Sequence, residues 1–226
     1  MKYKILFVDI DDTLLDFQKS EEIAIRKLLS KYINNLTEDI VKDYKQINVN
    51  YWKMFERGEI EREALLIARF KDLFEKYNCF VEDYSKINEE YFSILSSVPI
   101  ELDGAYEFLE KVFKDMKIYA ITNGVKRVQT KRLSMVNITK FFEKIYISEE
   151  VGFQKPEQQY FDYVLKDLGY PNKNDIVILG DSLTSDIQGG INCGIDTIWF
   201  NPHKNKSTVK YTYSISEYNQ FFDLVK

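Results

Sequence analysis

Ile5-Leu-Phe-Val-Asp-Ile-Asp-Asp-Thr13 is a short apolar run that ends in three carboxylates and a threonine. The apolar residues predict a buried β-strand over residues 4–9. In an open α/β sheet, ligands bind just beyond the carboxyl ends of the strands, so these acidic residues stand where chemistry is placed. Asp9 and Asp11 are two positions apart and can point to the same side. Two carboxylates held that close need a cation between them or a retained proton.

A solvated acidic turn is the alternative interpretation, and for an isolated Asp-x-Asp in a loop it is the better one. The pair at Asp9 and Asp11 instead ends a strand of buried character at the start of the chain. This position favours a functional site.

Composition limits the classes of function. With 226 residues, 45% of them hydrophobic, the chain suits one large domain or a core with a smaller insertion. A formal net charge of −5 argues against nucleic-acid and membrane partners, which require a basic surface. Two cysteines give no disulfide framework, and the apolar run near the N-terminus is too short for a signal peptide. We therefore expect a cytoplasmic protein.

The segment from Ser20 to Ser97 shows helical patterns and no convincing strand. Ser20 and Thr37 each precede acidic residues and are expected at helix N-termini. Gly58 and Asn78 follow apolar periodic stretches and suit helix C-termini. We expect residues 17–98 to form an inserted bundle of four or five helices.

Beyond Pro99, short β-type runs alternate with helical patterns. Strands are expected at 117–122, 144–148, 175–180 and 196–200, and helices at about 104–115, 126–136, 157–168 and 184–193. Such alternation predicts an α/β fold, a Rossmann-like parallel sheet with helices on both faces. Residues 1–16 and 99–226 would form this core domain.

The carboxyl ends of parallel strands meet at one edge, so the residues that follow each strand are expected to converge. They combine carboxylates with a lysine, a hydroxyl and an amide, which suits a metal and a phosphate. Their positions are Asp9, Asp11, Thr122, Asn123, Lys155, Asp181 and Asp186.

Each of the later segments has a structural alternative. Pro156 suits the first position of a helix, which would leave Lys155 at the N-cap, where its charge opposes the helix dipole. Because a lysine is unfavourable at an N-cap, we expect Lys155 to have a functional role. Thr122-Asn123-Gly124 alone reads as a turn, and the aspartates at 181 and 186 would alone read as caps of a helix that starts near Thr184. There, Thr184 and Ser185 already offer capping oxygens.

Together these segments resemble the four motifs of the haloacid dehalogenase-type phosphatase superfamily, in the right order and over the whole chain except the insertion. Asp9-x-Asp11-x-Thr13 is similar to the first motif, Thr122 to the second and Lys155 to the third. Gly180-Asp181 with Asp186 is similar to the fourth. The helical insertion resembles the superfamily's first cap type.

A narrower resemblance is to the bacterial noncanonical pyrimidine 5′-nucleotidases. It rests on Ile121-Thr-Asn-Gly124, Ile147-Ser-Glu-Glu-Val-Gly152, Lys155-Pro156 and Asp186-Ile-x-Gly-Gly-Ile-Asn-x-Gly194, with Trp52 followed by Gly58-x-Ile60 in the insertion.

The resemblance implies a Mg²⁺-dependent phosphomonoester hydrolase that works through a phospho-aspartate. It implies Asp9 as nucleophile and Asp11 as the acid and base. It also implies that Lys155 would neutralise the transferring group, and that Thr122 and Asn123 would bind the phosphate together with Asp9 and Lys155. Mg²⁺ would be bound by the side chains of Asp9 and Asp181 and by the main-chain carbonyl of Asp11. Asp186 and Thr13 would lie behind these ligands and hold them in place. An acid at Asp11 argues against dehalogenation, because a halide needs no proton.

An aromatic stripe runs through the insertion at near-helical spacing. Packing of the insertion's own core is the simpler interpretation. The functional one is that rings at Tyr51, Trp52 or Phe55 stack on a substrate base. The sequence leaves both open.

The substrate is expected to be a small phosphorylated metabolite, chiefly a pyrimidine nucleoside monophosphate. Another small-metabolite phosphatase, such as one for phosphoglycolate, or a sugar phosphomutase of the same fold is the alternative. A non-catalytic protein is disfavoured because every motif position is filled. Monomer and homodimer both stay open.

Overall fold

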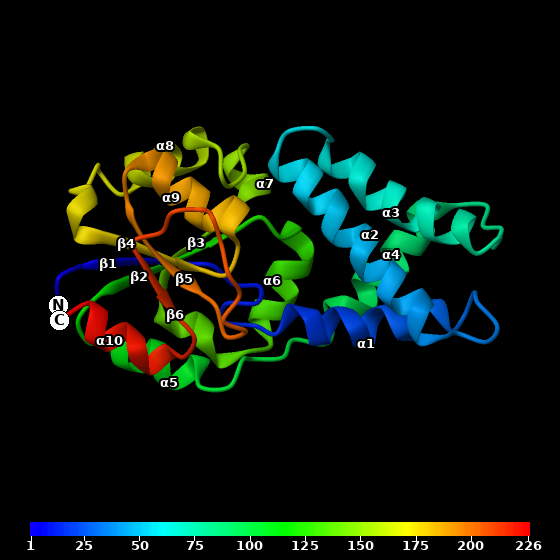
Figure 1. The fold of residues 1–226 in the computed structure, drawn as a ribbon, viewed down its shortest axis with the longest axis horizontal. Helices are drawn as coiled ribbons and strands as arrows, with labels where there is room; N and C mark the ends of the chain where they lie inside the picture. The colour runs from blue at the N-terminus through cyan, green and yellow to red at the C-terminus, as the bar shows by residue number, and fades with distance from the viewer. The chain divides into compact units, whose positions relative to one another are not determined.

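The computed structural model describes residues 1–226, which divide into two compact units (Figure 1). The core unit comprises Met1–Phe17 and Ile100–Lys226, and the helical unit comprises Gln18–Pro99. None of the helices combines the length and apolar composition needed to cross a membrane.

A six-stranded sheet, parallel throughout, organises the core unit. The strands in sheet order are β3 (Phe142–Ile147), β2 (Lys117–Thr122), β1 (Ile5–Val8), β4 (Ile176–Gly180), β5 (Asp196–Phe200) and β6 (Tyr213–Ile215). The predicted α/β fold with a parallel sheet is confirmed. β6 was not predicted, because three residues are too few to show an alternating pattern.

Strand β1 lies in the middle of the sheet, and its register fixes the level of the site. Val8 pairs with Ala120 of β2 and with Leu179 of β4. The residues that follow these three strands therefore emerge at the same level. The main-chain N–H of Asp9 still bonds to the carbonyl of Leu179 at 2.9 Å, so Asp9 starts from a fixed position.

Alternate residues of the strands pack into two apolar layers, one on each face of the sheet. Leu6 and Val8 belong to the cluster that contains α5 (Ala105–Val112). Phe7 belongs to the cluster that contains α8 (Gln158–Asp167). Figure 1 shows α5 and α10 on one side of the sheet and α8 and α9 on the other. The remaining helical segments of this unit are α6 (Lys126–Ser134), η1 (Asn137–Phe141), α7 (Ser148–Val151), η2 (Lys173–Asp175), η3 (Leu183–Ile187), α9 (Gln188–Cys193), η4 (Tyr218–Gln220) and α10 (Phe221–Leu224).

The helical unit is built from α1 (Phe17–Leu29), whose first residue still belongs to the core unit, and from α2 (Glu38–Glu56), α3 (Arg62–Lys76) and α4 (Tyr84–Leu95). Thr37 caps α2 as predicted, because its hydroxyl accepts from the N–H of Ile40. Gly58 and Asn78 adopt the left-handed conformation just past two helix ends. The prediction for Ser20 is wrong: α1 begins at Phe17, so Ser20 is buried inside the helix.

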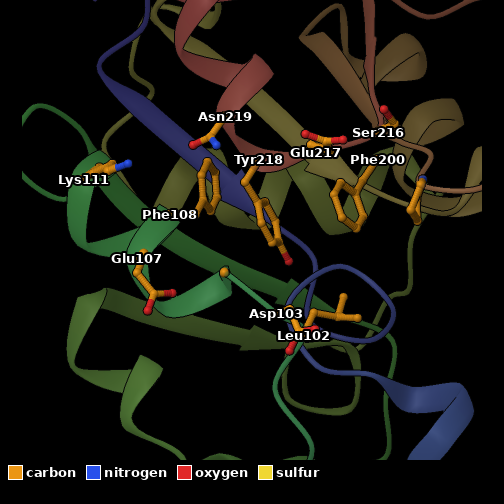
Figure 2. A pocket seen from close by; sticks show the side chains of 12 residues that line it. Leu102, Asp103, Glu107, Phe108, Lys111, Phe200, Ser216, Glu217, Tyr218 and Asn219 are labelled. Carbon is orange, nitrogen blue, oxygen red and sulfur yellow. The ribbon is translucent and has the colours of Figure 1, made fainter.

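The C-terminal segment supports the loop that follows β1. Tyr218 stacks between Phe108 and Phe200, with ring centroids 4.8 and 4.9 Å away, at the edge of a surface hollow (Figure 2). Its hydroxyl donates to the carbonyl of Thr13 at 2.6 Å, across 205 positions of sequence. Two distant parts of the chain are thereby joined beside the acidic loop.

Replacing Tyr218 by Phe should lower the free energy of unfolding by about 1–3 kcal/mol, because a buried carbonyl at Thr13 loses its partner. Urea denaturation would measure the change. Tyr170→Phe, which removes the hydroxyl of an exposed ring, is the control and should stay within about 0.5 kcal/mol of the wild type. Equal changes in the two variants would contradict the role given to Tyr218.

Candidate active site

A buried ammonium group lies at the centre of the site. Nζ of Lys155 is 2.6 Å from Oδ1 of Asp9 and 2.6 Å from Oδ1 of Asp186. It also donates to the carbonyl of Ile121 at 3.0 Å. The Lys155 and Asp186 side chains are 2% and 0% exposed, so the charges are removed from water and are stable there only because they are paired.

Lys155 is not at a helix N-cap, so that part of the sequence argument is wrong. Helix α8 starts at Gln158 with Glu157 as its cap, and Lys155 lies in the preceding loop with a cis peptide bond to Pro156. Asn123 holds this loop instead. Its amide oxygen accepts from the Lys155 N–H at 2.9 Å, and its amide nitrogen donates to the Lys155 carbonyl at 2.8 Å. Asn123 therefore positions Lys155 with its side chain.

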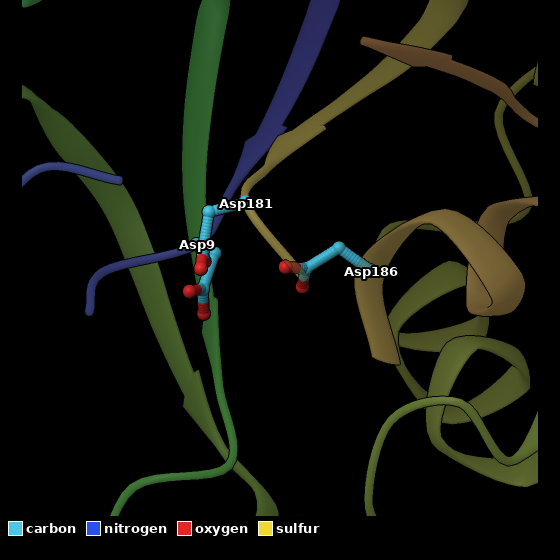
Figure 3. A group of neighbouring side chains, drawn as sticks. All are labelled: Asp9, Asp181 and Asp186. Atoms are coloured by element: carbon cyan, nitrogen blue, oxygen red, sulfur yellow. The ribbon is translucent and has the colours of Figure 1, made fainter. Parts of the chain in front are cut away.

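Asp181 adds a third carboxylate. Oxygen atoms of Asp9, Asp181 and Asp186 all lie within 4.8 Å of one another, and Figure 3 shows Asp9 and Asp181 side by side with Asp186 extending toward them. Thr13 holds Asp181 in place. Its hydroxyl donates to Oδ1 of Asp181 at 3.3 Å and accepts from the Asp181 N–H at 3.0 Å. These residues come from the segments after β1 and β4.

Asp186 is held on both of its oxygens. Oδ1 accepts from Lys155, and Oδ2 accepts from the N–H of Ser182 at 3.1 Å. A Cβ on Gly180 would overlap the Asp186 side chain, which explains the glycine. The helical segment begins at Leu183, and its cap is Ser182, which accepts from the Ser185 N–H, rather than Thr184 or Ser185. Asp186 is thus better suited to hold Lys155 than to bind a metal directly.

The three carboxylates and one ammonium leave two negative charges uncompensated. Burial, with repulsion from Asp186 and Asp11, raises the pKa of Asp9 well above its ordinary range despite Lys155. Burial and the charges of Asp9 and Asp186 raise the pKa of Asp181 in the same way. Burial alone would lower the pKa of Lys155, but its two carboxylate partners raise it above the ordinary value.

This donor set fits Mg²⁺, which prefers oxygen ligands and would neutralise the two excess charges. Asp9 and Asp181 can each offer a carboxylate oxygen to the ion, and the Asp181 carboxylate is not bonded to the Lys155 ammonium. The Asp11 side chain turns elsewhere, so its contribution would be the main-chain carbonyl.

Asp11 is bound by helix α6, a contact that the sequence reasoning missed. Nη1 of Arg132 is 2.5 Å from Oδ1 of Asp11, and Nε2 of Gln129 is 2.7 Å from Oδ2. The available signal was the pattern of α6, where Gln129 and Arg132 share the buried face with Val128 and Leu133. Polar residues on the apolar face of a helix mark a special environment.

Thr122 presents a hydroxyl at the end of β2. It accepts from the Gly124 N–H at 3.0 Å and from Nε2 of Gln129 at 2.9 Å. A hydroxyl that accepts twice keeps its own hydrogen for another acceptor, such as a phosphate oxygen. Thr122 is thus oriented as a donor at the level of Asp9.

In the helical unit, the aromatic stripe is divided between packing and surface. Tyr44, the first residue of the stripe, and Phe55 are buried, as the packing interpretation expects. Trp52 is half-buried with its edge against Phe55, and the Tyr51 hydroxyl bonds to Asp72 at 2.7 Å. A role for Tyr51, Trp52 or Phe55 in substrate choice stays a prediction.

Comparison with known proteins identifies the family of this chain. Residues 5–200 match the model of the haloacid dehalogenase-like hydrolases. The crystal structure of the HAD-hydrolase YfnB of Bacillus subtilis, bound to magnesium, superposes with a TM-score of 0.93 at 34% identity. That match covers 100% of this chain and 99% of the other.

Two curated relatives have named activities. A pyrimidine 5′-nucleotidase of Streptococcus pneumoniae is 34% identical, with 99% of this chain and 95% of the relative covered. A pyrimidine 5′-nucleotidase of Escherichia coli is 30% identical, with 100% and 99% covered.

Mg²⁺ should raise the thermal midpoint of unfolding more at about pH 7.5 than at about pH 5. Without metal, the raised pKa values mean that the folded protein binds more protons than the unfolded chain. Stability then falls as the pH rises from the ordinary aspartate pKa through these raised values. A bound cation removes that repulsion, whereas at low pH protons compete with it. Differential scanning fluorimetry would measure both effects, with Asp181→Asn as the variant that should lose the Mg²⁺ increment. The same increment at both pH values would contradict this account.

Proposed function

Because the chain belongs to the haloacid dehalogenase-like hydrolases, we propose that it is a Mg²⁺-dependent 5′-nucleotidase that acts on pyrimidine nucleoside monophosphates. The observation that carries the proposal is the pairing of Asp9 with the buried Lys155, beside Asp11 and Asp181. The two nucleotidase relatives, which match nearly the whole chain, support the choice of substrate.

Asp9 is the nucleophile. Its Oδ2 attacks phosphorus while Oδ1 stays bonded to Lys155, which gives an aspartyl phosphate. A carboxylate ~4 Å from one phosphate charge is repelled by about 4 kcal/mol at an effective dielectric near 20, and a dianion roughly doubles this. The ammonium of Lys155 offsets part of that repulsion as the phosphoryl group transfers.

Asp11 moves the proton. As the Asp9–phosphorus bond forms and the bond from phosphorus to the nucleoside O5′ breaks, Asp11 gives its proton to O5′. In the second step Asp11 takes a proton from water, whose oxygen attacks phosphorus and releases Asp9 with inorganic phosphate. Asp11 ends each cycle protonated, as it began.

The remaining residues orient the phosphate. The Thr122 hydroxyl and the Asn123 main-chain N–H are the donors to its oxygens. Lys155 acts on the phosphate through its positive charge, because its three N–H groups are already bonded to Asp9, Asp186 and the Ile121 carbonyl. The carboxylates of Asp9 and Asp181, with the Asp11 carbonyl, would hold Mg²⁺. The ion supplies charge neutralisation between carboxylate and phosphate. Thr13 and Asp186 fix Asp181 and Lys155.

The helical unit is proposed as a cap that excludes water during transfer. This unit, which is inserted after the first strand, would select the leaving group of the substrate. Tyr51 and Trp52 are its candidates for stacking on a pyrimidine, because both are partly exposed.

A substrate panel tests the function. UMP and dTMP should release phosphate at least about tenfold faster than phosphoglycolate, and EDTA should abolish release until Mg²⁺ is restored. β-Glucose 1-phosphate, assayed for isomer as well as phosphate, separates a phosphomutase. Activity on phosphoglycolate alone, or isomerisation without hydrolysis, would replace the proposed substrate class.

Asp9→Asn should lower kcat for UMP by at least about 10³-fold, because an amide cannot form the covalent intermediate. Steady-state phosphate release measures this, and circular dichroism checks the fold. Asp115→Asn, at an exposed position, is the matched control with unchanged kcat. Retained turnover in Asp9→Asn would remove Asp9 from its role.

A further inference from the structure

Helix α6 carries a buried guanidinium that the reaction described above does not use. Arg132 is 0% exposed. Its Nη1 bonds to Oδ1 of Asp11 at 2.5 Å and to Oε1 of Gln129 at 3.0 Å. The guanidinium also lies over the ring of Phe17, 5.5 Å from its centroid.

This arrangement is costly for a residue that serves only the fold. Nε and Nη2 of Arg132 are buried and have no hydrogen-bond partner. Most buried polar groups in native proteins are bonded, and an exception calls for a reason. An apolar side chain would fill the same space without stranding two donors, because replacing a buried ion pair by apolar residues is often neutral. The carboxylate that this guanidinium contacts is that of Asp11, so the burial of Arg132 is best explained by an effect on Asp11.

Gln129 joins the same group to the phosphate-binding hydroxyl. Its Nε2 donates to Oδ2 of Asp11 at 2.7 Å and to Oγ1 of Thr122 at 2.9 Å. Gly124 makes room for it, since an added Cβ would lie 2.6 Å from Nε2 and 2.7 Å from the next two carbons of Gln129. One amide thus fixes the distance between the proton donor and a phosphate ligand.

We propose that Arg132 and Gln129 are positioning residues that hold the Asp11 carboxyl in line with the leaving oxygen of a phosphate bound at Thr122. The proposal rests on the proposed function. Each Asp11 oxygen accepts one bond from α6, so the plane of the carboxyl is fixed while each oxygen keeps a second site for the transferred proton. Neither residue touches the substrate, and both act through Asp11.

Leaving-group dependence separates this role from a structural one. The 5′-oxygen of a nucleotide leaves only with a proton, whereas nitrophenolate leaves as the anion. A variant with a misplaced Asp11 should therefore release the nucleoside slowly but release nitrophenolate at a nearly normal rate. Loss of general folding or of metal binding would slow both esters alike.

The test measures single-turnover release of the alcohol from UMP and from p-nitrophenyl phosphate with enzyme in excess, so that only the first step is observed. Arg132→Met and Gln129→Met should each slow uridine release by about 10²-fold, the usual contribution of a placed general acid. The release of p-nitrophenol should change by less than about threefold in Arg132→Met. In Gln129→Met, which also loses the bond to Thr122, it should slow less than uridine release does. Lys131→Met, the same kind of change at an exposed position of α6, is the control and should alter neither rate.

Gly124→Ala provides a second route that leaves Arg132 and Gln129 in the sequence. The added methyl group displaces Gln129 from both Asp11 and Thr122, so uridine release should again fall more than p-nitrophenol release. This variant keeps the proposal testable if Arg132→Met does not fold.

The outcomes are distinct. A selective loss for UMP supports the proposal. Equal losses for the two esters, or no loss in folded variants, overturn it while the proposed function stands. A wild-type enzyme that hydrolyses neither ester contradicts the proposed function and this inference with it.

Discussion

The ammonium group of Lys155 is the constraint on which the site depends. It is buried between two carboxylates that come from the segments after β1 and β4, while its own loop is clamped by Asn123 after β2. A charge held away from water tolerates little displacement, so each of these segments must end where it does. Gly180 without a side chain and Ser182 with its N–H on Asp186 are consequences of the same requirement.

The layout of the core was accessible from sequence for a simple reason. The predicted ends of β2 and β5 match the structure, because their apolar runs, such as the one that starts at Ile118, stop abruptly at polar residues. Once strands alternate with helices, parallel pairing follows, and with it the gathering of what comes after each strand. The structure does bring Asp9, Lys155, Asp181 and Asp186 together. No detailed geometry was needed for that step.

What the sequence concealed depends on side-chain direction and on contacts between distant segments. The N-cap argument for Lys155 was wrong, because the helix starts later than Pro156 suggests. Arg132 could not be assigned to Asp11, since neither the level of α6 nor the orientation of its faces follows from periodicity alone. Tyr218 and the short β6 gave no local signal of any kind, because their importance lies in partners that are far away along the chain.

The central place of β1 also has a consequence for synthesis on the ribosome. The strand made first pairs with β2 from the middle of the chain and with β4 from its last quarter. The helical unit, whose contacts are local, can close early. Strand β1 must instead wait, apolar and unpaired, until β2 has emerged, and its other edge stays open until β4 follows. Premature release or a stalled ribosome would therefore expose an aggregation-prone segment, and chaperones should bind chiefly to β1.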